Sequence, residues 1–399
     1  MSDIYNNVCN IKVIGVGGAG NNAVNRMVEA GITSAYFVSV NTDQQVLNMS
    51  KADRTITLGQ QITKGLGAGS RPEVGKAAAE ESERELREIL KDSNLVFVTC
   101  GLGGGTGTGA APVIAKIAKE MGVLTVGVVT KPFAFEGPVR KNNAEKGLEE
   151  LKKYVDTLVI IPNEQLFKIL KRGTSLIDAF RYADDVLRQA IQGVSELIVK
   201  PSLINLDFAD VSTIMKNKGL AHMGIGKGRG EYKTIEAVRQ AVTSQLLETS
   251  IEGATGILIN ITGGQDLALS EIYEAVDLVR DVVDERCNII FGATIIEDIR
   301  DEVQVTVIAT GFDGEFDNSK PEDLPEFSKD IQDDQADDEY QDDEIESDEE
   351  EIEENVEEYE ENEEEEVEDE TQIEDISFNS KVDIGEDSSL PPFLRKLKK

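Results

Sequence analysis

The stretch from residue 101 to residue 109, GLGGGTGTG, has the composition of a loop that binds phosphate. Six of its nine residues are glycines, which let backbone N–H groups approach an anion closely, and Thr106 and Thr108 add hydroxyl donors. No Lys-Ser or Lys-Thr pair follows, so this is not a Walker A loop. A phosphate bound here would be held by amides, hydroxyls and a metal ion. The alternative, a plain turn between two elements, rarely needs so many glycines.

Two further glycine turns occur earlier in the chain. Residues 15–20 match the G-x-G-x-x-G fingerprint of dinucleotide-binding sites, and Asp43 follows roughly twenty positions later. Residues 64–69, KGLGAG, form the other turn. The fingerprint alone predicts a nicotinamide-dependent dehydrogenase, which stays the alternative. Three phosphate-binding turns on one sheet fit a nucleoside triphosphate better.

Two pairs of charged residues could add chemistry to these turns. Asp207 and Asp210 are three positions apart at the start of a short expected helix, so their carboxylates share one face. They either cap that helix or bind a cation and polarise water. Glu136 and Arg140 follow another strand end. They are either an ordinary surface pair or, beside a phosphate site, a place where Arg140 contacts ligand oxygens.

Alternating strands and helices are expected to position these residues. Short apolar runs predict buried parallel strands, and helical patterns lie between them. The strands are expected at 11–17, 36–40, 95–100, 124–129 and 157–162, and the helices at 23–30, 73–90, from 110 onward with Pro112 in the first turn, and 141–153. This order predicts a doubly wound α/β sheet with the glycine turns at the carboxyl ends of the strands, where such sheets bind ligands.

A second unit is expected after a long helix. Apolar residues recur at helical spacing over residues 176–199. Beyond about residue 220 the pattern predicts further strands and helices: strands at 256–261, 289–295 and 303–309, and helices near 233–247 and 269–284. Because the last two strands follow each other closely, we expect a mixed sheet with antiparallel pairing.

The charge of the chain is concentrated near its end. The net charge of the 399 residues is −37, of which residues 317–389 carry −33 and residues 1–316 only −8. So acidic a segment cannot bury a core, and we expect it to stay disordered and extended. The last ten residues carry +4 and include apolar side chains, which is typical of a docking peptide at the end of a tether.

Composition also excludes several classes of function. The acidic balance disfavours nucleic acid as a direct partner. Three cysteines without metal-like spacing argue against a zinc site or a disulfide framework and suit a reducing cytosol. The sequence has a single histidine, His222, which argues against acid–base catalysis by histidine. No apolar stretch approaches the ~20 residues of a membrane span.

Taken together, these residues resemble FtsZ, the family of bacterial tubulin-like cell-division GTPases. Residues 104–109 are similar to the tubulin signature loop, residues 205–211 to the catalytic loop of the family, and residues 390–395 to its partner-binding tail peptide. The resemblance implies a Rossmann-like GTPase domain, a central helix, a smaller α+β domain with a mixed sheet, and a disordered acidic tail. The implied ranges are 1–10 for a leader, 11–175 for the GTP-binding domain, 176–200 for the central helix, 201–316 for the C-terminal catalytic-loop and assembly domain, 317–386 for the linker and 387–399 for the peptide.

The resemblance also implies roles for individual residues. Contacts to the phosphates fall on Gly18, Ala19, Gly20, Asn21, Asn22, Gly104, Gly105, Thr106, Gly107 and Thr108. Ala68 and Gly69 would sense the γ-phosphate, and Glu136 and Arg140 would contact the ribose and phosphate region. Asn163, Phe180 and Asp184 would recognise or stack on guanine. Asn205, Asp207 and Asp210 would reach into the pocket of the next subunit and position the attacking water near Mg²⁺, itself held through phosphates and water.

The implied function is that of a GTP-dependent cytoskeletal polymer. The protein would bind GTP and GDP, assemble with itself into head-to-tail protofilaments, and hydrolyse GTP between subunits. It would form a division ring in the cytoplasm, at midcell under the membrane. Membrane-tethering and regulatory division proteins would bind the tail through Leu390, Pro391, Pro392, Phe393, Leu394 and Arg395. Two departures from the family are Ala19, where many relatives have glycine, and the Leu390-Pro391-Pro392 start of the tail peptide.

Overall fold

The computed structural model describes most of the chain up to residue 312. The described residues are 9–170, 173–199, 206–230, 232–244, 251–284, 286–296, 299 and 301–312. Asn205, most of the expected leader, the acidic linker and the terminal peptide lie outside these ranges.

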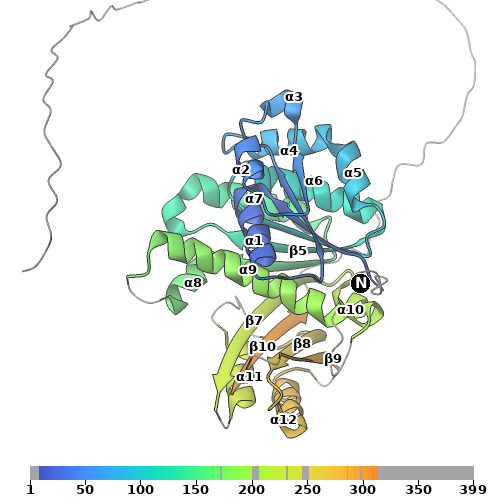
Figure 1. Cartoon of the computed structure of the whole chain (residues 1–399), viewed down its shortest axis with the longest axis vertical. Helices are drawn as coiled ribbons and strands as arrows, with labels where there is room; N and C mark the ends of the chain where they lie inside the picture. Colours follow the sequence, from blue (N-terminus) through green and yellow to red (C-terminus); the bar gives the residue numbers. More distant parts are fainter. Residues whose placement is uncertain are drawn as a thin grey trace, which may run out of the picture. The chain divides into compact units, whose positions relative to one another are not determined.

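Six parallel strands form the first part of the sheet (Figure 1). Their order is β3-β2-β1-β4-β5-β6. Their bounds are Ile11–Val16 for β1, Tyr36–Asn41 for β2, Arg54–Thr57 for β3, Leu95–Gly101 for β4, Leu124–Lys131 for β5 and Thr157–Pro162 for β6. The predicted strands are confirmed, and β3 is a short edge strand that the sequence pattern did not reveal.

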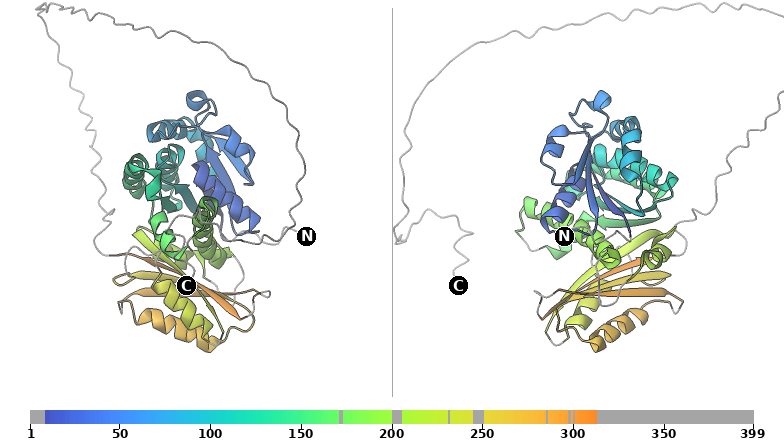
Figure 2. Two further views of the ribbon diagram at one scale, coloured as in Figure 1. Left: turned by 90° about the vertical axis from the view of Figure 1, so that its left-hand side faces the viewer. Right: turned by 45° about the vertical axis from the view of Figure 1, so that its right-hand side comes forward.

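Helices cover both faces of this sheet, which confirms the doubly wound arrangement (Figures 1 and 2). On β1, Val13 packs toward α1 (Gly17–Glu29) and α9 (Leu176–Val199), whereas Ile14 packs toward the opposite layer. The remaining helices of this part are α2 (Gln44–Asn48), α3 (Gln60–Thr63), α4 (Pro72–Glu81), α5 (Glu83–Leu90), α6 (Thr106–Glu120), the 3₁₀ turn η1 (Ala134–Glu136), α7 (Pro138–Lys152) and α8 (Asn163–Ile169). Among the described helices, none is long and apolar enough to cross a membrane.

Two helix predictions were wrong in detail. The helix predicted over residues 73–90 is broken at Ser82. The Ser82 hydroxyl accepts the Gly59 N–H at 3.0 Å, a contact with a distant loop. The helix after the glycine loop begins at Thr106 and not at residue 110, so Pro112 lies inside it. The glycine loop and the helix N-terminus are therefore one feature.

A mixed sheet follows, formed by β7 (Gly219–Arg229), β8 (Gly256–Gly263), β9 (Asn288–Ile295) and β10 (Glu302–Thr310). Strand β10 pairs antiparallel with β7 and β8, and β9 pairs parallel with β8. The predicted mixed sheet is confirmed, but the last two strands are not neighbours because β8 lies between them. Helices α11 (Lys233–Val242) and α12 (Leu269–Arg280) pack on one face, and α9 packs on the other.

Strand β7 escaped prediction because glycine occupies alternate positions of its second half. A Cβ on Gly224 or Gly226 would lie 1.9 Å from the Ala241 or the Ala237 carbonyl oxygen, so only glycine lets α11 pack this closely. Strand β7 also pairs parallel with β6 over three residues, from Thr157–Gly219 to Val159–Ala221. The two sheets thus form one ten-stranded sheet, and the domain boundaries drawn from the sequence stay predictions.

Helix α10 (Phe208–Met215) is held by its C-terminal end. Two buried threonines from different strands, Thr157 and Thr310, donate hydroxyl hydrogen bonds to the Met215 and Ile214 carbonyls. Next to them, the buried Asp156 carboxylate accepts the Thr125 N–H at 2.9 Å and the Asn217 N–H at 3.4 Å. These bonds fix α10 against the amino ends of β5 and β6.

Replacing this carboxylate is expected to destabilise the protein. Asp156→Ala removes the acceptor of the buried Thr125 N–H and of the Asn217 N–H, so we expect the free energy of unfolding to fall by about 1–3 kcal/mol in urea denaturation. The matched control is Asp277→Ala, which removes an exposed ion pair with Arg280 and should cost less than about 0.5 kcal/mol. Equal losses in both variants would contradict the role given to Asp156.

Candidate functional site

The N-termini of α1 and α6 meet at the carboxyl ends of β1 and β4. A Cβ on Gly17 would lie 2.9 Å from the Gly107 nitrogen, so the two first turns are in direct backbone contact. Neither helix has a side-chain N-cap or an acidic residue in its first turn. Because the first amides of a helix have no partner within it, these two ends form a cradle for an anion.

The glycine loop around this cradle is shaped by close contacts. Gly103 adopts a φ of +104°, and its N–H donates to the Thr108 hydroxyl at 2.8 Å. A Cβ on Gly105 would lie 2.8 Å from the Ala68 Cβ, so the 64–69 turn packs directly on the loop. Thr108 is buried, whereas Thr106 is half-buried and bonds to Thr42.

Other glycines in these turns border open space. A Cβ on Gly18 or Gly104 would meet no atom of another residue within 4 Å, and Gly69 is exposed. Ala19 is half-buried and Asn22 is exposed beside them. These positions leave room for a ligand in front of the two helix ends.

Two of the predicted phosphate contacts serve the packing of the site. A Cβ on Gly20 would lie 2.4 Å from the Thr99 carbonyl oxygen, so Gly20 lets α1 approach β4. The buried Asn21 side chain donates to the Gly15 carbonyl at 2.8 Å and accepts from Asn41 at 2.9 Å. Its side-chain amide is therefore used within the chain.

The segment after β5 forms one side of the site. Glu136 and Arg140 are ion-paired with each other, and Glu136 also accepts the Phe133 N–H at 2.9 Å. A Cβ on Gly103 would lie 2.9 Å from the Arg140 carbonyl oxygen, so this segment touches the glycine loop. The ion pair between Glu136 and Arg140 agrees with the interpretation as a surface pair. Because this segment touches the glycine loop, Arg140 also stays a candidate for contact with ligand oxygens.

An aromatic cluster adjoins this segment. The rings of Phe133 and Phe135 stack with centroids 5.1 Å apart, and Phe180 from α9 meets Phe133 edge-on at 5.4 Å. Phe135 and Phe180 are both exposed. Nearby in the fold, at the end of β6, Asn163 is buried and its Oδ1 has no hydrogen-bond partner. An exposed aromatic surface and an unpaired amide oxygen are what a planar, hydrogen-bonding base requires.

Asp184 lies one turn beyond Phe180 on α9 and is held by a residue of α1. Its carboxylate accepts from the Arg26 guanidinium at 3.2 Å. Burial raises the pKa of Asp184 to about 6, and the attraction of Arg26 only partly opposes this rise. A buried carboxylate with a raised pKa lowers the stability of the fold, so Asp184 is a candidate for ligand recognition.

The acidic pair lies at the opposite edge of the sheet. Asp207 caps α10 by accepting the Asp210 N–H at 2.8 Å, which confirms the capping interpretation, and both aspartates are exposed. Phe208 and Ser212 of α10 line a cavity with Asn94 and Leu124, which lie at the amino ends of β4 and β5. The structure therefore gathers the glycine turns at one edge and leaves Asp207 and Asp210 at the other.

Two site residues were missed in the sequence. Asn41 ends β2 and Thr42 follows it, and both are buried although polar. Asn41 holds Asn21, and Thr42 bonds to Thr106 at 2.6 Å. The available signal was a run of polar residues at the carboxyl end of a predicted strand next to a glycine turn.

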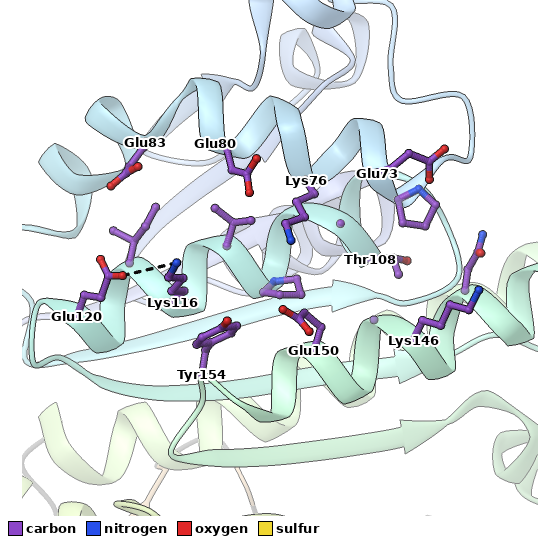
Figure 3. Close-up of a pocket in the computed structure, with 17 residues that line it drawn as sticks. Glu73, Lys76, Glu80, Glu83, Thr108, Lys116, Glu120, Lys146, Glu150 and Tyr154 are labelled. Carbon is purple, nitrogen blue, oxygen red and sulfur yellow. Dashed lines mark ion pairs between the residues drawn. The ribbon is translucent and has the colours of Figure 1, made fainter. Parts of the chain in front are cut away.

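A pocket lies behind the glycine loop. It measures about 580 Å³ and runs between α4, α6 and α7 (Figure 3). Glu80 of α4 and Glu150 of α7 line opposite sides, and Lys116 pairs with Glu120 at 3.9 Å on the α6 floor. Thr108 reaches this groove from the back of the loop. In the described residues, no group of three acidic, histidine or cysteine side chains could hold a metal ion.

Comparison with known proteins gives two family matches. Residues 10–171 match the GTPase domain of the Tubulin/FtsZ family, and residues 219–313 match the C-terminal domain of the FtsZ family. A solved structure described as an empty FtsZ dimer from M. jannaschii is 50% identical, with a TM-score of 0.74 over 76% of this chain and 89% of that chain.

Two solved structures from Haloferax volcanii share the fold. CetZ1, described as a GDP-bound monomer, is 24% identical, with a TM-score of 0.66 over 76% of this chain and 94% of that one. CetZ2, described as a protofilament bound to GTPγS, is 23% identical, with a TM-score of 0.63 over 75% of this chain and 92% of that one.

The raised pKa of Asp184 predicts a pH-dependent cost in stability. Its folded pKa of about 6 exceeds the ~3.9 of an exposed aspartate, so wild-type stability falls as pH rises between these values. Asp184→Asn removes this charge and should be about 1–3 kcal/mol more stable than wild type at pH 7.5, with the difference lost near pH 4.

The measurement is urea denaturation of the full chain at several pH values. Asp178→Asn is the matched control, because Asp178 is an exposed aspartate earlier on α9 that pairs with Arg181. A stability difference between wild type and Asp184→Asn that does not change with pH would contradict the assignment.

Proposed function

The chain belongs to the FtsZ family of tubulin-like GTPases, and on this premise we propose that it assembles head to tail into protofilaments of a cell-division ring. It binds guanine nucleotide and hydrolyses GTP, as the family does. The observation that carries the proposal is the separation of the glycine turns from Asp207 and Asp210 across the sheet.

This separation leaves each subunit with an incomplete site. A strand rises about 3.3 Å per residue, so the seven residues of β4 put roughly 20 Å between its two ends. Asp207 and Asp210 therefore belong to a different surface from the cradle of their own chain. Stacking subunits along one direction brings the acidic helix of one copy onto the glycine turns of the next. The relatives described as a dimer and as a protofilament support self-association of this kind.

The cradle fits the nucleotide in three parts. The phosphates lie on the amides of the two helix ends, at Gly18 to Asn22 and Gly104 to Thr108, with Ala68 and Gly69 beside the terminal phosphate. Glu136 and Arg140 border the ribose. The exposed ring of Phe180 and the unpaired Asn163 oxygen receive the base, and Asp184 accepts hydrogen bonds from the guanine N–H groups.

Catalysis in this proposal depends on positioned groups and not on a covalent intermediate. Asp207 and Asp210 of the neighbouring copy hold and orient the attacking water against the terminal phosphate, and Asn205 acts with them. Mg²⁺, held through phosphates and water, would neutralise charge on the phosphate oxygens. The helix-end amides stabilise the charge that develops there.

The rest of the chain connects the polymer to its partners. We assign the acidic segment 317–386 as a tether and the terminal residues 390–395 as the peptide that binds membrane-tethering and regulatory division proteins. The site of action is the cytoplasmic face of the membrane at midcell. The charge reversal, from −33 over residues 317–389 to +4 over residues 390–399, is the sequence observation that supports this assignment.

The test is to separate nucleotide binding from hydrolysis. Asp210→Ala should bind GTP and assemble like wild type but hydrolyse GTP roughly 100-fold more slowly, because the water is no longer positioned. Thr213→Ala, on the same helix, is the control and should keep wild-type turnover. Normal turnover by Asp210→Ala would refute the role of this residue.

Asp207 needs a second variant because it also caps α10. Asp207→Ala should lose about 1 kcal/mol of stability as well as activity. Asp207→Asn keeps the cap and removes the charge, so it should retain stability and still lose hydrolysis. An Asn variant with full activity would show that only the cap matters.

A further inference from the structure

Thr42 connects two loops of the candidate site. It follows β2, is fully buried, and its hydroxyl lies 2.6 Å from the Thr106 hydroxyl in the glycine loop. Its carbonyl oxygen accepts the Gly67 N–H at 3.0 Å and the Thr63 hydroxyl at 3.3 Å. One residue thus touches the phosphate cradle with its side chain and the 64–69 turn with its backbone.

The 64–69 turn has a backbone with several left-handed residues, which such contacts help to hold. Lys64, Gly65, Gly67 and Gly69 all have φ between +53° and +89°. For Lys64, which has a Cβ, this conformation is unfavourable unless the surroundings impose it. The first residue of α2 also holds the turn, because the Gln44 N–H donates to the Gly65 carbonyl at 3.0 Å.

We propose that Thr42 is a positioning residue that orients the Thr106 hydroxyl toward the phosphates and fixes the 64–69 turn beside them. The inference rests on the proposed function, because it takes the glycine loop as the phosphate site. It assigns Thr42 no contact with the nucleotide.

The direction of the hydrogen bonds follows from the chemistry of two hydroxyls. Each hydroxyl has one proton to donate. When Thr106 donates its proton to a phosphate oxygen, the bond between the two threonines persists only if Thr42 donates to Thr106. The bonds then run one way, from Thr42 to Thr106 to the phosphate, and each polarises the next. Thr42 thereby strengthens Thr106 as a donor to the anion.

Thr42 also links the position of the glycine loop to that of the 64–69 turn. Ala68 of the turn packs against Gly105, next to Thr106 in the loop. Movement of Thr42 would therefore shift both the hydroxyl that meets the phosphates and the backbone that supports Ala68 and Gly69.

Two substitutions separate hydrogen bonding from packing. Thr42→Val keeps the shape and removes the hydroxyl, and Thr42→Ser keeps the hydroxyl and removes the methyl group. We expect Thr42→Val to bind a fluorescent GDP derivative about three- to tenfold more weakly and Thr42→Ser to stay within twofold of wild type. Thr125→Val is the control, since it removes a buried hydroxyl that bonds Val123 at the other edge of the sheet, and it should leave GDP affinity unchanged.

A double-mutant cycle tests whether Thr42 acts through Thr106. Thr106→Val alone should weaken GDP binding, and adding Thr42→Val to it should change affinity less than twofold. A thermal melting curve of every variant shows whether the protein used in the binding measurement is folded.

Three results would overturn the proposal. These are unchanged GDP affinity in Thr42→Val, weaker binding by Thr42→Ser than by Thr42→Val, and full additivity of the two valine substitutions. Absence of GDP binding by the wild-type protein would overturn the proposed function together with this inference, whereas wild-type binding with any of the three results would overturn the inference alone.

Discussion

The direction of the parallel strands is the constraint on which the site depends. Strands β1, β4, β5 and β6 are parallel and all end at the same edge of the sheet. Parallel pairing alone therefore brings together the turns that follow them. The amino ends of β4 and β5 lie at the other edge, where α10 is held by Asp156 and two threonines. One sheet thus holds the glycine turns at one edge and α10 at the other.

Close backbone approach is the second requirement, and glycine supplies it. Gly17 and Gly107 bring two helix ends together, and Gly20 brings α1 onto β4. The gathered amides are open to an anion, since no side chain of either first turn caps them. Asp184 is an acceptor in a comparable position. Arg26 compensates its burial only in part, so its carboxylate is suited to a ligand with N–H donors.

Much of this arrangement follows from local patterns in the sequence. The apolar runs predicted the parallel strands, and the glycine turns were placed at the correct ends of β1 and β4. Features that depend on distant contacts were missed. Ser82, where the helix breaks, contacts the distant Gly59, and Asp184 pairs with the distant Arg26. The glycines that let α11 pack on β7 also hide the strand pattern. Local periodicity carries no information about such contacts.

We propose that the hydrolytic site is completed between two copies of the chain. The most direct test measures the rate of GTP hydrolysis against protein concentration, with light scattering recorded on the same samples. A site shared between copies predicts a threshold concentration below which hydrolysis vanishes, matched by the onset of GTP-dependent scattering. Hydrolysis strictly proportional to protein concentration, without assembly, would contradict it and would place the complete site within a single chain.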